Sequence, residues 1–164
     1  VLRAYECLVD GVPVSSSRIR KLLAAGKISD VNRLLGYGYT LSGIVEHGNA
    51  IGTKLGFPTA NIALGGNKQL PANGVYSVLA NVDGVTYHAI ANIGTKPTIG
   101  GENLSLEVYM LDFVGDLYGK LLQVTFLDFL REEKKFASLD ELKNQIAMDV
   151  QEVRECLRAN HEDV

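Results

Sequence analysis

The residues best suited to chemistry in this chain lie in Gly52–Asn61, which reads GTKLGFPTAN. This run is not helical, because Pro58 fixes its own φ and pushes the residue before it toward extended backbone. In an extended segment, alternate side chains share a face, so Thr59 and Asn61 point the same way about 7 Å apart. A hydroxyl and an amide oxygen near the ammonium of Lys54 suit Mg²⁺ that takes the rest of its ligands from water and phosphate.

This loop is not the usual phosphate-binding loop. The segment Gly48–Lys54 lacks the G-x-x-x-x-G-K-[ST] spacing, and no helix follows whose N-terminus could hold phosphates. Two interpretations stay open on spacing alone. One is a nucleotide site on a β scaffold, and the other is a glycine-rich turn followed by a strand with two outward polar residues.

A second candidate for chemistry is Glu107, in the segment Asn103–Met110 with the sequence NLSLEVYM. The even positions of this segment are apolar and should face a core, so Glu107 faces the other way, between Ser105 and Tyr109. A glutamate is ionised at neutral pH and can accept a proton from an alcohol. On the pattern alone, an ordinary strand carboxylate is the simpler interpretation.

The elements that position these residues are short strands. From Gly38 onward, apolar and β-branched segments alternate with turn signals, among them Asp83-Gly84, a two-residue hairpin signal. We expect about six mostly antiparallel strands, at residues 39–46, 59–63, 75–82, 85–93, 104–113 and 121–130. Their short connections favour a small barrel that is closed or nearly closed.

Helices are expected at both ends of the chain. At the C-terminal end, Ser138 and Glu141 form a capping box that opens a helix. An apolar stripe on this helix should dock on the barrel; it comprises Leu142, Ile146, Val150, Val153 and Leu157. At the N-terminal end, Ser15–Ser17 caps a short helix that Gly26 ends, and a second helix covers residues 29–35. These two helices have few apolar positions, so we expect residues 1–37 to be an appendage to a domain spanning 38–164.

Composition narrows the class of protein. The 164 residues suffice for one core of ordinary size plus an appendage. A net charge of −3 and a pI near 5.6 argue against a nucleic-acid surface. Cys7 and Cys156 have no spacing partner and are expected to be free thiols in a reducing cytoplasm. Since no apolar run reaches membrane length, we expect a cytoplasmic protein without nucleic-acid or membrane partners.

Several of these stretches closely resemble riboflavin kinase, the C-terminal module of the bacterial bifunctional riboflavin kinase/FMN adenylyltransferase (FAD synthetase). The resemblance runs from about residue 38 to the end. It is carried by residues 48–61, ANIGTKPT at 91–98, LEV at 106–108, residues 112–113 and 116–119, and LREEKKF at 130–136. It implies a mainly β protein, a six-stranded Greek-key antiparallel barrel with a C-terminal helix and a short helical N-terminal appendage. It also implies transfer of the γ-phosphate of ATP, with Mg²⁺, to the 5′-hydroxyl of riboflavin, giving FMN and ADP.

The resemblance assigns roles to residues. Glu107 matches the family's catalytic glutamate, Thr59 and Asn61 match its catalytic and metal-binding pair, and Arg131 matches an arginine near the active site. The expected nucleotide-binding residues are Gly48, Gly52, Lys54, Gly56, Pro58, Thr59 and Asn61. The expected flavin-binding residues are Glu107, Arg131 and Phe136. The chain departs from the family at Lys54 and Lys96, where arginine is frequent, and at Glu132, where proline is frequent.

The N-terminal stretch resembles the end of the adenylyltransferase module, whose Ser-Ser-Thr-Arg-Ile-Arg motif contacts nucleotide phosphates. Here Ser17 replaces the threonine, and Arg18 and Arg20 are either phosphate ligands of that module or solvated arginines. We therefore expect residues 1–37 to be the remnant and linker of a fused FMN adenylyltransferase whose body is missing from this chain. The alternative function is a non-catalytic flavin-binding barrel. An oligonucleotide-binding barrel would need a basic groove with stacking aromatics, and the composition offers neither.

Overall fold

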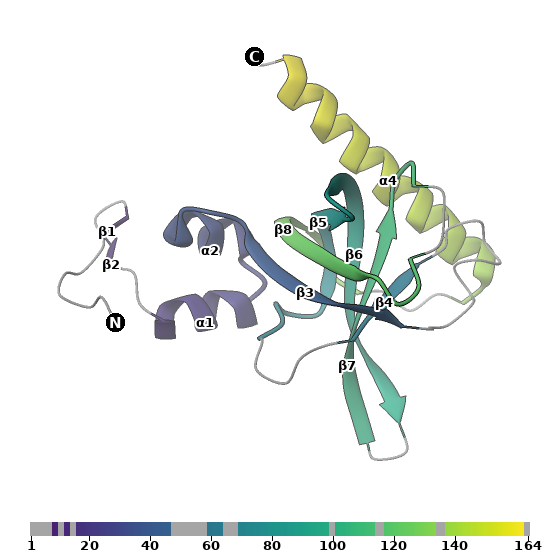
Figure 1. Ribbon diagram of the computed structural model, residues 1–164, viewed down its shortest axis with the longest axis horizontal. Coiled ribbons are helices and arrows are strands. Elements are labelled where there is room, and N and C mark those ends of the chain that lie inside the picture. The colour runs from purple at the N-terminus through teal and green to yellow at the C-terminus, as the bar shows by residue number, and fades with distance from the viewer. Residues whose placement is uncertain are drawn as a thin grey trace.

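The computed structural model describes residues 8–9, 12–13, 16–46, 59–63, 69–98, 101–113, 117–133 and 137–162. Its N-terminal part contains two antiparallel strands of two residues each, β1 (Leu8–Val9) and β2 (Val12–Pro13). The helices α1 (Ser16–Ala24) and α2 (Ile28–Leu35) follow them. A barrel and a long C-terminal helix make up the rest of the described chain (Figure 1).

The barrel is closed and has six strands. They are β3 (Tyr39–Glu46), β4 (Ala60–Ile62), β5 (Gly74–Val82), β6 (Val85–Thr98), β7 (Gly101–Met110) and β8 (Leu121–Arg131). The order around the barrel is β3-β4-β7-β6-β5-β8, and every neighbouring pair is antiparallel. Because β5, β6 and β7 are consecutive hairpin strands and β8 returns beside β5, the connection is a Greek key. The predicted barrel is confirmed.

Local sequence explains the tightest turn of the barrel. Asp83 and Gly84 connect β5 to β6 with φ values of 52° and 81°. A two-residue hairpin turn of this kind needs positive φ at both positions, which aspartate tolerates and glycine adopts freely. The Asp-Gly signal therefore predicted this hairpin correctly.

The largest differences from the predicted strand boundaries are in β6 and β7, and the other strand ends agree to within one residue. The structure extends β6 through Gly94 and Pro97 to Thr98, and β7 covers Gly101–Met110 rather than 104–113. The glycine and proline are loop signals. Here they lie in a two-stranded arm that projects beyond the barrel (Figure 1). In such an arm proline is tolerated, because only one neighbouring strand has to be hydrogen-bonded.

The barrel interior is filled by alternate side chains from all six strands, as the pleat requires. Tyr76 and Phe126 are fully buried there, with ring centroids 5.4 Å apart in an edge-to-face arrangement. The Tyr76 hydroxyl donates a 2.6 Å hydrogen bond to the Ala72 carbonyl oxygen, and burial raises the pKa of Tyr76 to about 12.

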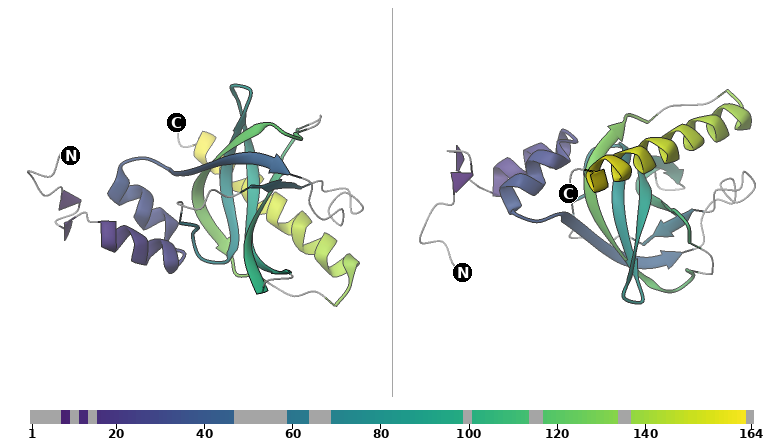
Figure 2. Two further views of the ribbon diagram at one scale, coloured as in Figure 1. Left: turned by 60° about the horizontal axis from the view of Figure 1, so that its bottom comes forward. Right: turned by 90° about the horizontal axis from the view of Figure 1, so that it is seen from above.

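Helices α1 and α2 close one end of the barrel (Figure 2). Leu23, Ile28 and Val31 belong to the same buried cluster as the barrel residues. Asn32 fixes the junction, because its amide donates to the Phe126 carbonyl oxygen at 2.8 Å and its Oδ1 accepts from the backbone N–H of Tyr39 at 2.7 Å. These helices thus share a core with the barrel. The assignment of residues 1–37 to another module stays a prediction.

Helix α4 (Leu139–Glu162) crosses the outer face of the barrel (Figure 2). One half of the predicted capping box is present, since the Glu141 backbone N–H donates to Ser138 Oγ at 3.3 Å. The other half differs, because the Glu141 carboxylate accepts from the backbone N–H of Ala137, at 3.0 Å, rather than from that of Ser138. Val150 and Val153 of the predicted apolar stripe pack on the sheet in a second cluster. The strand and turn residues of that cluster include Val75, Ile90, Tyr109, Leu111 and Leu130.

Candidate functional site

A row of three polar side chains crosses the outer face of the barrel. Glu107 on β7 lies in direct register with Asn61 on β4 and with Asn92 on β6. The residues before and after each of them on its strand are buried in the interior, so these three side chains point outward. Adjacent strands are about 4.8 Å apart, so two amides flank one carboxylate at contact range.

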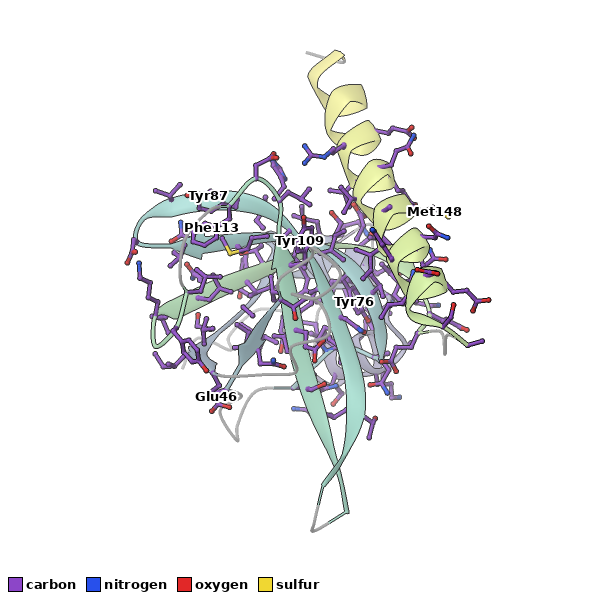
Figure 3. All side chains as sticks on the ribbon, turned by 90° about the vertical axis from the view of Figure 1, so that its right-hand side faces the viewer. Glu46, Tyr76, Tyr87, Tyr109, Phe113 and Met148 are labelled. Atoms are coloured by element: carbon purple, nitrogen blue, oxygen red, sulfur yellow. The ribbon has the colours of Figure 1, made fainter. Side chains whose placement is uncertain are left out.

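The surroundings of this row differ on its two sides along the strands. On one side lies Tyr109, two residues beyond Glu107 on the same face and beside α4 (Figure 3). On the other side lies Gly94, two residues beyond Asn92. Gly94 is buried beneath Glu133, and a side chain added at position 94 would overlap the Glu133 carboxylate. A larger residue at position 94 would therefore displace the carboxylate of the exposed Glu133 side chain.

The structure brings together some of the predicted site residues and leaves others unplaced. Asn61 and Glu107 are adjacent, and Thr59 is half-buried immediately before β4. Six predicted residues lie outside the described part of the chain: Gly48, Gly52, Lys54, Gly56, Pro58 and Phe136. Their nucleotide- and flavin-binding roles stay predictions.

Arg131 lies at the end of β8 and forms a bidentate ion pair with Asp149 of α4. Its Nε donates to Asp149 Oδ1 at 2.9 Å and a terminal nitrogen donates to Oδ2 at 2.8 Å. The side chains are 17% and 4% exposed, and Gln145 donates a further hydrogen bond to Asp149 at 3.1 Å. Arg131 also donates to the Glu132 carbonyl oxygen at 3.1 Å. It therefore fixes α4 to the start of the segment predicted to contact flavin.

Sequence reasoning missed Asp149. The signal for it was present, because Asp149 stands between Ile146 and Val153 in the predicted apolar stripe of the helix. A charged residue in such a stripe is buried and needs a partner. The sequence could not identify which arginine supplies that partner, since the pairing depends on how α4 crosses β8.

A second ion pair joins α4 to the turn after β7. Arg154 donates to both carboxylate oxygens of Asp112, at 2.9 and 3.2 Å, on the protein surface. The hydrogen bonds and charge of Arg154 lower the pKa of Asp112. Asp112 has a φ of 60°, a left-handed conformation that aspartate adopts more readily than most residues. Ion pairs therefore hold α4 on both sides of its apolar contact with β5, β6 and β7, through Asp149 on one side and Arg154 on the other.

The oxygen donors of the row fit a magnesium–nucleotide complex. Asn61 offers an amide oxygen and Thr59 a hydroxyl two residues before it, while the Glu107 carboxylate in adjacent register is placed to accept a proton. Mg²⁺ prefers such oxygen ligands and completes its shell with water and phosphate oxygens. Within the described ranges, no cluster of three or more histidine, cysteine, aspartate or glutamate side chains could hold a metal.

Within the part of the chain that the structure describes, no helix is both long and apolar enough to cross a membrane.

Known proteins similar to this chain include bifunctional enzymes and solved structures. A protein in Pseudomonas fluorescens called bifunctional riboflavin kinase/FMN adenylyltransferase is 44% identical over 147 residues, covering 89% of this chain and 47% of the relative. A riboflavin kinase structure from Trypanosoma brucei has a TM-score of 0.51 and 32% identity, covering 73% of this chain and 79% of the other. A Streptococcus pneumoniae structure described as a macrolide-efflux protein has a TM-score of 0.86 and 36% identity, covering 91% of this chain and 49% of the other.

The chain thus spans about half the length of the curated relatives it matches. The model of the riboflavin kinase (flavokinase) family matches residues 35–157, which include the whole barrel and most of α4. On this match, the chain belongs to the riboflavin kinase family.

Proposed function

We propose that this chain is a riboflavin kinase that transfers the γ-phosphate of ATP to the 5′-hydroxyl of riboflavin. The observation that carries the proposal is the direct register of Glu107 with Asn61 on a barrel of this family. A kinase acting on an alcohol needs a metal-bound triphosphate and a base at the acceptor hydroxyl. The two residues provide one candidate for each requirement on adjacent strands.

In this mechanism Glu107 accepts the proton of the 5′-hydroxyl as that oxygen attacks the γ-phosphorus. The bond from the γ-phosphorus to the bridging oxygen breaks, so FMN forms and ADP leaves. Thr59 and Asn61 would hold Mg²⁺, which would supply charge neutralisation for the triphosphate. The glycines and Lys54 of the preceding loop contact the nucleotide.

The flavin ring is flat and largely apolar, and it needs a slot with few polar groups. We assign one wall of this slot to the segment that begins at Arg131 and includes Phe136. Arg131 orients that segment through its bonds to Asp149 and to the Glu132 carbonyl oxygen. Its guanidinium is occupied by these groups, so its contribution to flavin binding is mainly to hold the wall in place.

We further propose that the chain is the C-terminal part of a cytoplasmic bifunctional FAD synthetase. Support comes from the match of 89% of this chain to about half of a bifunctional relative. The two N-terminal helices, which pack on the barrel, agree with this proposal. Arg18 and Arg20 then belong to the adenylyltransferase side of the protein. Its substrates are small molecules.

The test is formation of FMN. The chain is incubated with ATP, Mg²⁺ and riboflavin, and the flavins are separated by chromatography; the proposal predicts an FMN peak that grows with time and disappears on chelation of Mg²⁺. A chain that binds riboflavin tightly without forming FMN would instead be the flavin-binding barrel. A thermal-shift assay with Mg²⁺ and ADP separates the same alternatives, because only a nucleotide-binding barrel is stabilised by them.

A further inference from the structure

Asn92 carries a buried acceptor that no described residue uses. Its Oδ1 is inaccessible to solvent and has no hydrogen-bond partner within the described ranges. Most buried side-chain polar atoms in proteins are hydrogen-bonded, and leaving one unpaired costs free energy. An unpaired acceptor beside the proposed base therefore gains a partner when a ligand with a donor displaces the groups that cover it.

The neighbours of Asn92 on the outer face explain why its acceptor has no partner. Its direct register partner on β5 is Val75, and Ile90 precedes it on the same face of β6; both are apolar. Its partner on β7 is Glu107, and Gly94 after it is covered by the Glu133 carboxylate. An ionised carboxylate only accepts hydrogen bonds. None of these side chains can donate to Asn92 Oδ1.

The strand order indicates which ligand brings the donor. Glu107 lies between Asn61 on β4 and Asn92 on β6. If Asn61 holds the metal and phosphates, the reacting hydroxyl lies at Glu107 and the phosphoryl group lies toward β4. The carbon chain bearing that hydroxyl then extends toward β6. The strand spacing of about 4.8 Å is a span that a few carbons of an extended polyol cover.

We propose that Asn92 is a substrate-binding residue whose Oδ1 accepts a hydrogen bond from a secondary hydroxyl of the ribityl chain. This contact holds the chain so that its terminal hydroxyl lies at Glu107. The inference rests on the proposed kinase function and adds a specificity to it. The site selects a polyhydroxylated side chain over an alkyl chain that carries only the terminal hydroxyl.

The test compares two substrates, riboflavin and a flavin whose side chain is ω-hydroxypentyl, so that the secondary hydroxyls are absent. Asn92→Ala should lower kcat/KM for riboflavin roughly threefold to tenfold, the worth of one neutral hydrogen bond, and leave the ω-hydroxypentyl flavin unchanged. Asn92→Val removes the same acceptor with a β-branched residue that suits a strand. Asn92→Asp keeps an acceptor and should retain the preference for riboflavin.

The matched control is Asn81→Ala, on the outer face of β5. Asn81 donates to Thr86 Oγ1 at 2.9 Å and is remote from the row, so both substrates should react as with the unaltered chain. Flavin binding in the presence of Mg²⁺ and ADP can be measured by fluorescence quenching. The dissociation constants should show the same preference for riboflavin over the ω-hydroxypentyl flavin.

The inference is overturned if Asn92→Ala and Asn92→Val lower the rates for both substrates by the same factor, as a structural role predicts. It is also overturned if neither variant changes the preference. If the unaltered chain makes no FMN, the proposed function is wrong, and the inference is overturned with it. If the unaltered chain is active but Asn92→Ala and Asn92→Val both keep the preference, the inference alone is overturned.

Discussion

Glu107 and Asn61 are direct cross-strand partners, one on β7 and one on β4, and both face outward from the barrel. Residue 61 ends the glycine-rich segment that the sequence connects with nucleotide binding, whereas residue 107 lies on the far side of two hairpins. The barrel joins them because β4 inserts between β3 and β7. The closure of the sheet therefore assembles the candidate catalytic centre.

Replacement of Thr59 or Asn61 by alanine should impair use of Mg·ATP rather than folding. Both residues are half-buried at the start of β4 and outside the main core. Each substitution should lower kcat/KM for ATP at least about tenfold, which corresponds to the lower end of the free energy of a hydrogen bond to a charged group. Thermal unfolding measured beside nucleotide affinity decides the matter. A large drop in Tm with unchanged affinity would show that the pair is structural.

The Arg131–Asp149 pair should stabilise the docking of α4 in a way that only a double variant exposes. Arg131→Met or Asp149→Leu alone leaves one buried charge without its partner and should lower the free energy of unfolding by roughly 3–5 kcal/mol. The double variant should recover most of this loss, because no buried charge is left. Urea denaturation of the three variants measures the coupling.

The more exposed ion pair between Arg154 and Asp112 is the control for these Arg131 and Asp149 variants. It also joins α4 to the barrel by a bidentate contact, yet its side chains are 43% and 74% exposed, far more than those of Arg131 and Asp149. Arg154→Met should therefore have a much smaller effect on unfolding than Arg131→Met. Equal effects of the two changes would contradict the argument from burial.

Tyr76 should make the protein sensitive to alkali. Burial raises its pKa from 10.0 to about 12, so the folded protein holds the phenolic proton more tightly than the unfolded chain. The resulting stabilisation is fully present below pH 10 and is lost as the pH rises toward 12. Tyr76→Phe should remove this part of the pH dependence while losing about 1 kcal/mol from the bond to Ala72 at neutral pH. Urea titrations between pH 8 and about 12 would measure both effects.

The chain should form FMN and no FAD. Its two N-terminal helices pack on the barrel end and cannot provide a second nucleotide site by themselves. Incubation with FMN, ATP and Mg²⁺, followed by chromatography, measures the adenylyltransferase activity directly. A growing FAD peak would show that the interpretation of residues 1–37 as a remnant is wrong.

Most of the barrel was predictable because each strand carries its own alternation of apolar residues, and Asp83-Gly84 fixes one hairpin locally. The extension of β6 through Gly94 and Pro97 was not, since these residues signal loops and only pairing with β7 keeps them extended. Likewise, the docking of α1 and α2 depends on Asn32 reaching the Phe126 and Tyr39 backbones, a contact between distant segments.

The candidate site was predictable to a different degree. The outward direction of Glu107 followed from the alternation of its own strand. Its register with Asn61 and Asn92 did not, because strand order and register depend on how the whole sheet closes. Asn92 was part of a recognised motif, and only the register placed it beside the proposed base.

The central claim is that Glu107 is the base for phosphoryl transfer to riboflavin, and the Glu107→Gln variant tests it most directly. The change is nearly isosteric, so binding of ADP and riboflavin should persist. The measurement is the rate of FMN formation at saturating ATP, Mg²⁺ and riboflavin, for Glu107→Gln and the unaltered chain. The account predicts a fall of roughly 10²- to 10⁴-fold in kcat with both ligands still bound. A rate within about threefold of the unaltered chain would contradict it, because a general base contributes far more than that.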